Sequence, residues 1–174
     1  METKHLLLEP CSIQHLEKLL AGASAFKAAF GIEVVDGYIE FPEAIQYSVE
    51  KLRSGVVQKE WWTYMILHKT NNSLIGIGGY KGVPDSQGVV EIGYGIAPAY
   101  RGKGYATEAA STLINNAINI AGVNAVWAHT LPEFNASTRV LQKCGMEMVA
   151  EIIDPDDGKV WRWQFRKGTS LGVI

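Results

Sequence analysis

The stretch EIGYGIAPAYRGKGYATEA, residues 91–109, runs from a strand pattern through a glycine-rich turn into the start of a helix pattern. Gly102 and Gly104 allow backbone amides to approach an anion closely. Arg101 and Lys103 add positive charge where the first N–H groups of the helix lack intrahelical partners. The stretch therefore predicts a binding site for a phosphate or pyrophosphate group.

Two common phosphate-binding motifs do not fit this turn. A Walker A loop ends in Gly-Lys-Ser/Thr, whereas Gly104 is followed by Tyr105. The dinucleotide fingerprint requires glycine or alanine where Thr107 stands, and its strand opens a βαβ unit rather than a meander. A glycine-rich turn carrying two solvated cations is the alternative that the pattern alone leaves open.

Composition limits the class of protein. The 174 residues are 47% hydrophobic and 20% charged, with a formal net charge of −2, which is typical of one compact domain, here over residues 1–174. The charge argues against a nucleic-acid-binding protein, and no apolar run is long enough for a membrane span or a signal peptide. We therefore expect a cytoplasmic protein without nucleic-acid or membrane partners. Two distant cysteines and four scattered histidines predict no disulfide and no metal site.

Hydrophobic periodicity predicts an α+β fold. Helical spacing indicates helices over 12–20, 41–55, 104–122 and 135–145, with Ser12 and Asn135 as N-caps. β-branched and aromatic runs indicate strands over 5–10, 61–69, 73–82, 89–98, 123–130, 146–153 and 160–165. Residues 23–40 have weak periodicity and fit either partial helix or loop. The strand, helix and strand after residue 89 favour a parallel pair inside a mixed, mainly antiparallel sheet flanked by helices.

Two motifs resemble a known family. Arg101, Gly104 and Ala106 match the [QR]xxGx[GA] pattern of the GNAT acetyltransferase superfamily. NASTRVLQKCGM, residues 135–146, resembles the NxxSxxxLxKxGF signature of the RimJ/RimL-like subgroup, which acetylates ribosomal-protein N-termini, although Met146 replaces the usual phenylalanine. The resemblance implies the GNAT fold and acetyl-CoA as cosubstrate. The cofactor-binding residues that it implies are Ile96, Ala97, Arg101, Gly102, Lys103, Gly104, Tyr105, Ala106, Thr107, Asn135, Ser137 and Lys143.

The resemblance also suggests catalytic residues. Glu91 resembles the general base of some family members, although strand alternation leaves open an outward-facing glutamate. Many relatives protonate the leaving thiolate with a tyrosine on the later helix; that helix has none here, so Ser137 is the expected substitute. Tyr94, Tyr105 and His129 are further candidates. Gly93 and Gly95 would permit a bulge that exposes amides to the thioester carbonyl.

The acceptor is a primary amine in this interpretation. The subgroup implies a protein or peptide N-terminal amine, attacking acetyl-CoA directly; a small-molecule amine and a non-catalytic acyl-CoA-binding module are the alternatives. Acidic residues could form a rim that attracts a cation, or could simply be solvated. These residues are Glu33, Asp36, Glu40, Glu43, Asp154, Asp156 and Asp157.

Adjacent Trp61 and Trp62 should point to opposite sides of a strand, one of them toward a cleft or a dimer contact. We expect a monomer or homodimer.

Overall fold

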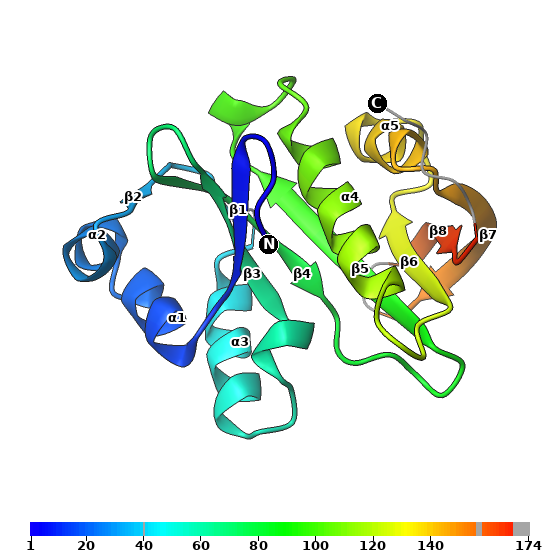
Figure 1. Cartoon of the computed structure of the whole chain (residues 1–174), viewed down its shortest axis with the longest axis horizontal. Coiled ribbons are helices and arrows are strands. Elements are labelled where there is room, and N and C mark those ends of the chain that lie inside the picture. Colours follow the sequence, from blue (N-terminus) through cyan, green and yellow to red (C-terminus); the bar gives the residue numbers. More distant parts are fainter. Residues whose placement is uncertain (40, 156–157, 169–174) are drawn as a thin grey trace.

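A computed structural model describes residues 1–39, 41–155 and 158–168. Their strands form one twisted sheet in the order β1-β3-β4-β5-β6-β8-β7, and a short β2 also pairs with β4 (Figure 1). The strands are β1 (Leu6–Pro10), β2 (Glu33–Val34), β3 (Thr63–His68), β4 (Ser73–Tyr80), β5 (Val89–Ile96), β6 (Ala125–Thr130), β7 (Glu147–Asp154) and β8 (Gly158–Arg166). Only the β5–β6 and β2–β4 pairs among these are parallel. The mixed, mainly antiparallel sheet is confirmed.

Five α-helices flank this sheet in the described residues: α1 (Ile13–Leu20), α2 (Ala23–Phe30), α3 (Glu43–Arg53), α4 (Tyr105–Ile118) and α5 (Ala136–Lys143). The predicted caps are confirmed. The Ser12 side chain accepts from the His15 N–H at the start of α1, and Asn135 accepts from the Ser137 and Thr138 N–H groups at the start of α5. None of the described helices is both long and apolar enough to cross a membrane.

The sheet separates two apolar cores. On one face, α4 and α5 cover the sheet, and Leu113, Ile114, Leu141 and Trp163 are among the buried side chains there. On the other face, α1, α2 and α3 pack against the first strands of the sheet. In Figure 1, α1 and α2 lie at the left end of the molecule, α4 crosses its middle, and α5 lies at the right. Within the described residues, the second face therefore has no helix over β5, β6 and β8.

Three details differ from the sequence interpretation. Residues 33–34 form β2, a strand too short to carry a period-2 signal. Helix α4 ends at Ile118 rather than at the predicted residue 122. Gly122, with φ of +87°, belongs to the turn that follows the helix. Gly93 and Gly95 would permit a bulge, but β4 and β5 pair in continuous register through both glycines.

Trp61 and Trp62 precede β3, since Trp61 ends a short 3₁₀ helix (Lys59–Trp61), so the expected alternation along a strand is wrong, but the two rings pack on different partners. Trp61 packs on Tyr80 in the α4 core, and the Trp62 ring lies 6.0 Å from the ring of Tyr47 on α3. Both are half-buried.

Gly79 is required where β3 and β4 meet. Its φ is +141°, and a Cβ there would lie 2.0 Å from the carbonyl oxygen of Trp62. We expect Gly79→Ala to lower the free energy of unfolding by about 3 kcal/mol or more, because strain and a backbone clash combine. Its register partner Gly93 is the control, since a Cβ there meets no described atom within 4 Å. Urea unfolding measures both variants, and equal losses would contradict the expectation.

Candidate active site

An opening between β5 and β6 lies at the centre of the sheet. The parallel pairing runs from Val89/Ala125 to Glu91/Trp127, and beyond that pair β5 has no β6 partner within the described chain. Since β5 bonds to β4 through its odd-numbered residues, such as Glu91 to Lys81, the alternation turns the N–H groups of Tyr94 and Ile96 toward the opening. The edge of β5 therefore offers a line of hydrogen-bonding groups to an extended ligand.

A cleft of about 410 Å³ runs from this edge to the start of α4. Nine of the predicted cofactor-binding residues line it: Ile96, Arg101, Gly102, Gly104, Tyr105, Ala106, Thr107, Ser137 and Lys143. Tyr94, Gly95, Tyr100, Ala136, Arg139 and Val140 complete the lining. Fold and motif thus bring two sequence segments, 94–107 and 136–143, to opposite walls of one cleft.

The glycine loop has the geometry that an anion needs. Gly102 and Gly104 have φ of +74° and +86°, and Gly104 is the N-cap of α4 without a side-chain hydrogen bond from the described residues. The first N–H groups of α4 consequently remain available to a ligand at the positive end of the helix dipole. Arg101 Nε donates to the Ile96 carbonyl at 2.9 Å, which fixes the guanidinium between the end of β5 and the loop.

Three predicted cofactor residues lie outside the lining. Lys103 Nζ donates to the Ala99 carbonyl at 3.1 Å and sits 5.2 Å from the Tyr100 ring centroid, so its ammonium is turned back onto the preceding turn. Ala97 is buried and donates its N–H to the Ile75 carbonyl. The Asn135 side-chain oxygen is engaged in capping α5. Contact with a cofactor stays a prediction for these residues.

Tyr94 joins the two walls of the cleft. Its hydroxyl donates to the Ser137 carbonyl at 3.4 Å, across from β5 to the first turn of α5. Burial raises the pKa of Tyr94, so the hydroxyl keeps its proton at neutral pH. The Ser137 side chain is exposed in the same wall. Of the predicted proton-donor candidates, Tyr94, Tyr105 and Ser137 line the cleft and His129 does not, and Tyr94 lies on β5 itself.

Glu91 lies on the sheet face opposite α4, at the inner end of the opening. Its Oε1 is 2.5 Å from Lys81 Nζ and 3.0 Å from His129 Nδ1. His129 Nε2 accepts from Arg162 Nε at 3.1 Å, which places the ring hydrogen on Nδ1, the atom beside Glu91. The Arg162 guanidinium also lies 3.9 Å from the Trp127 ring centroid. A carboxylate and a neutral imidazole therefore meet where the two strands separate.

Several polar atoms of this cluster are buried without a hydrogen bond to any described residue. They are Glu91 Oε1, His129 Nδ1 and Trp127 Nε1. The Glu91–His129 and Glu91–Lys81 contacts are close, but they are ion-pair contacts rather than aligned hydrogen bonds. Because a buried polar group without a partner is costly, these atoms are suited to complementary groups of a ligand.

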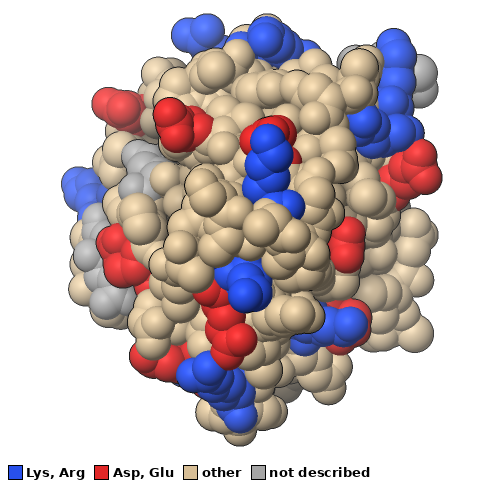
Figure 2. All heavy atoms as spheres, turned by 90° about the vertical axis from the view of Figure 1, so that its left-hand side faces the viewer, with Lys and Arg blue, Asp and Glu red and all other residues tan. Residues whose placement is uncertain are grey.

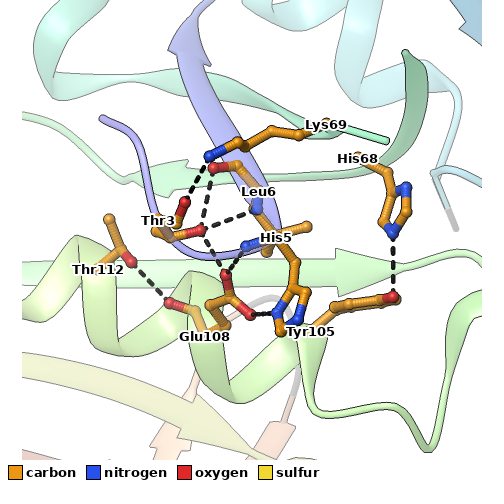
Figure 3. A network of polar contacts seen from close by, with 8 residues as sticks. All are labelled: Thr3, His5, Leu6, His68, Lys69, Tyr105, Glu108 and Thr112. Carbon is orange, nitrogen blue, oxygen red and sulfur yellow. Dashed lines mark hydrogen bonds and ion pairs between the residues drawn. The ribbon is translucent and has the colours of Figure 1, made fainter. Parts of the chain in front are cut away.

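A polar network ties the start of α4 to the N-terminus (Figure 3). The Glu108 carboxylate contacts the Thr3 hydroxyl, accepts from the His5 N–H at 2.8 Å and lies 2.9 Å from His5 Nδ1. Beside it, His68 Nε2 and the Tyr105 hydroxyl are 3.0 Å apart. The helix turn that follows the glycine loop is therefore held by residues that precede β1 and by His68 of β3.

We expect this network to make stability depend on pH. Burial alone would raise the pKa of Glu108, but hydrogen bonds from Thr3 and His5 and the charge of His5 outweigh it, and the pKa lies below its usual value of 4.5. The carboxylate thus adds stability fully above about pH 4.5, and this stability is lost as pH falls through the lowered pKa. Glu108→Gln should lower the free energy of unfolding at pH 7 by about 1–2 kcal/mol, with the difference from wild type shrinking toward pH 3.

Chemical unfolding between pH 3 and pH 7 measures that difference. The control is Glu151→Gln, which removes a carboxylate that is paired with Lys159 but exposed, and so changes stability little. A Glu108→Gln difference that stays constant with pH would contradict the assignment.

The rest of the described chain offers a surface of mixed charge and no candidate metal site. On the face that Figure 2 shows, basic and acidic side chains are interspersed. Within the ranges that the structure covers, no group of three or more His, Cys, Asp or Glu side chains could hold a metal ion. Of the proposed acidic rim, Glu33 pairs with Lys27, and Glu43 begins α3. Glu40, Asp156 and Asp157 lie outside the described residues, so the rim stays a prediction.

Known proteins resemble this chain in sequence and in fold. Residues 5–147 match the family model described as acetyltransferase (GNAT) domain. The chain is 35% identical to YjdG of Bacillus subtilis, an uncharacterized N-acetyltransferase, over 106 residues that span 61% of this chain and 63% of that protein. The curated relative is thus covered over less than two thirds of its length.

Two solved structures share the fold. One is described as a candidate ribosomal-protein-serine acetyltransferase of Vibrio cholerae, with a TM-score of 0.69, 14% identity, and 95% of each chain covered. The other is the spermidine N-acetyltransferase of Vibrio cholerae in complex with CoA and spermine, with a TM-score of 0.69, 15% identity, and 96% of this chain and 98% of that chain covered. Family match, sheet topology and cleft agree: the chain belongs to the acetyltransferase (GNAT) domain family.

Proposed function

We propose that the protein is a cytoplasmic N-acetyltransferase that transfers the acetyl group of acetyl-CoA to a primary amine. The observation that carries the proposal is the cleft that joins the glycine loop at the start of α4 to the part of β5 that has no β6 partner, which follows Glu91 along the strand. The loop amides and Arg101 would bind the pyrophosphate, and the edge of β5 would bind the pantetheine arm. N–H groups on that edge would polarise the thioester carbonyl.

Glu91 acts as the general base in this proposal. Its carboxylate is at the start of the opening and already contacts an ammonium group, that of Lys81. An acceptor amine in the same position would give its proton to Glu91 and attack the thioester carbon. His129 is a positioning residue, since Arg162 fixes its tautomer with the Nδ1 hydrogen toward Glu91.

Tyr94 and Ser137 compete for the role of proton donor to the leaving thiolate. We expect Tyr94→Phe to lower kcat about 10-fold or more with little change in the KM for acetyl-CoA, because a protonated hydroxyl at the edge of β5 is lost. Ser137→Ala should lower kcat less. Steady-state kinetics of CoA release measures both variants, and the reverse order would assign the role to Ser137.

Direct attack is favoured over an acetyl-enzyme. Cys11 and Cys144 are both buried, and desolvation raises the pKa of each thiol. A nucleophilic cysteine normally needs the opposite, an accessible thiol with a lowered pKa. Neither side chain lines the cleft.

The unpaired groups near Glu91 favour one class of amine. Trp127 Nε1 is a buried donor without a described acceptor, on the β6 residue that pairs with Glu91, whereas the His129 Nδ1 hydrogen already faces the Glu91 carboxylate. A peptide N-terminus carries an ammonium for the carboxylate and a carbonyl oxygen next to it for a donor. A protonated polyamine offers donors only and would leave the Trp127 N–H unsatisfied. We therefore favour a peptide or protein N-terminal amine over the small-molecule alternative, to which the spermidine acetyltransferase neighbour points.

An acceptor comparison tests the proposal. CoA release and product mass are measured with acetyl-CoA and either a short peptide with a free N-terminus or spermidine, with rates expressed per neutral amine. The peptide should give a kcat/KM about 10-fold or more above that of spermidine, since each unpaired buried donor costs roughly 1–3 kcal/mol. A preference for spermidine overturns the acceptor class. Acetyl-CoA binding without CoA release from any amine would instead favour a non-catalytic acyl-CoA-binding module.

A further inference from the structure

Lys81 brings a primary amine of the chain itself to the proposed base. Its backbone N–H donates to the Glu91 carbonyl at 2.9 Å, so the two residues are direct neighbours across β4 and β5. The side chains point to the same side, with Lys81 Nζ 2.5 Å from Glu91 Oε1. The Lys81 ammonium therefore stands where the proposed function requires the acceptor ammonium to stand.

This pair differs from the other lysine–carboxylate pairs in its position. Glu91 is the last β5 residue that pairs with β6, so the free edge of β5 begins at the next residue. One or two residues of strand span only about 3–7 Å, and a lysine carries its amine on a flexible four-carbon stem. Lys69 pairs with Glu2 at 2.6 Å and Lys159 pairs with Glu151 at 3.1 Å, so in neither pair does the ammonium group contact a residue of β5.

The Lys81 side chain is exposed enough for its ammonium group to move. The Lys81 side chain is 58% exposed, whereas that of Glu91 is 22% exposed, and Glu91 Oε1 is buried beneath its partners. An incoming acceptor must displace the Lys81 ammonium from this oxygen. In the absence of an acceptor, the amine held there is that of Lys81.

We propose that Lys81 is a self-acetylation site, modified within one molecule when acetyl-CoA is bound and no other amine occupies the opening. The inference rests on the proposed function, in particular on Glu91 as the base. Glu91 takes one proton from the Lys81 ammonium, and the neutral nitrogen attacks the thioester carbon. The new C–N bond forms as the C–S bond breaks, the thiolate takes the second proton lost by the nitrogen, and the proton on Glu91 passes to water. The products are Nε-acetyl-Lys81 and CoA.

Mass spectrometry tests the proposal on the full chain. The purified protein is incubated with acetyl-CoA alone, and acetylation at each lysine is followed by intact mass and peptide mapping over time. We expect Lys81 to be acetylated at least 10-fold faster than Lys69 and Lys159, at a rate independent of protein concentration. Glu91→Gln should slow Lys81 acetylation about 100-fold and leave the other lysines at their chemical rate. Lys81→Arg removes the fast modification, and Lys69→Arg, the matched control, leaves it.

Each outcome of these experiments either supports or overturns the proposal. Acetylation of Lys81 no faster than that of Lys69, or a rate unaffected by Glu91→Gln, overturns self-acetylation. A parallel assay with a peptide acceptor separates the two proposals: peptide turnover in that assay, together with an unmodified Lys81 when acetyl-CoA is supplied alone, rejects the self-acetylation site and leaves the proposed function standing. Absence of both reactions rejects the proposed function and this inference with it. Lys81 already acetylated in the purified wild type but not in Glu91→Gln supports the proposal.

Discussion

Glu91→Gln should lower kcat/KM about 100-fold while leaving the dissociation constant of acetyl-CoA unchanged. The amide keeps the size of the side chain but cannot accept a proton from the attacking amine, and general-base catalysis typically contributes 100-fold or more. The carboxylate lies at the opening between β5 and β6, whereas the loop that would bind the pyrophosphate lies at the start of α4. Glu91→Gln should therefore slow the chemical step without changing the binding of acetyl-CoA.

Steady-state kinetics and isothermal titration measure the two quantities. Glu151→Gln is the control, because it removes another lysine-paired carboxylate from a strand that does not border the cleft. Equal activity of Glu91→Gln and wild type would reject Glu91 as the base and favour its reading as an ordinary strand glutamate.

Arg101→Ala should weaken acetyl-CoA binding about 10- to 100-fold. The Arg101 Nε bond to the Ile96 carbonyl fixes the guanidinium beside the loop, and a charge-assisted hydrogen bond to phosphate is worth about 1.5–3 kcal/mol. Titration of acetyl-CoA measures the change, with a thermal melt to verify the fold. Arg53→Ala is the matched control, since that arginine lies at the end of α3 and pairs with Glu17 of α1 at the surface. Unchanged binding by Arg101→Ala would mean that the turn carries solvated cations and no phosphate site.

The sequence predicts the elements that local rules determine. The glycines of the loop, the Ser12 and Asn135 caps and the apolar face of α4 act through neighbours a few residues away, so their patterns can be read directly. Even the parallel strand pair follows from the order of strand, helix and strand. These features account for the position of the cleft.

Features that depend on register and on distant contacts could not be predicted. The face of Glu91 is decided by how β5 pairs with β4 and β6, and the same pairing brings Lys81 and His129 to its carboxylate. The contact of Thr3 with Glu108 joins residues 105 positions apart. Lys103 turns back onto Ala99 because its own turn offers a carbonyl nearer than the cleft. No short-range pattern carries this information.

The central claim is direct transfer from acetyl-CoA in the cleft to an amine beside Glu91, and one kinetic experiment tests it most directly. Initial rates of CoA release are measured with acetyl-CoA and a peptide acceptor both varied. Direct attack requires both substrates to be bound at once, so double-reciprocal plots should give lines that intersect. Parallel lines would indicate a covalent acetyl-enzyme and would contradict the account.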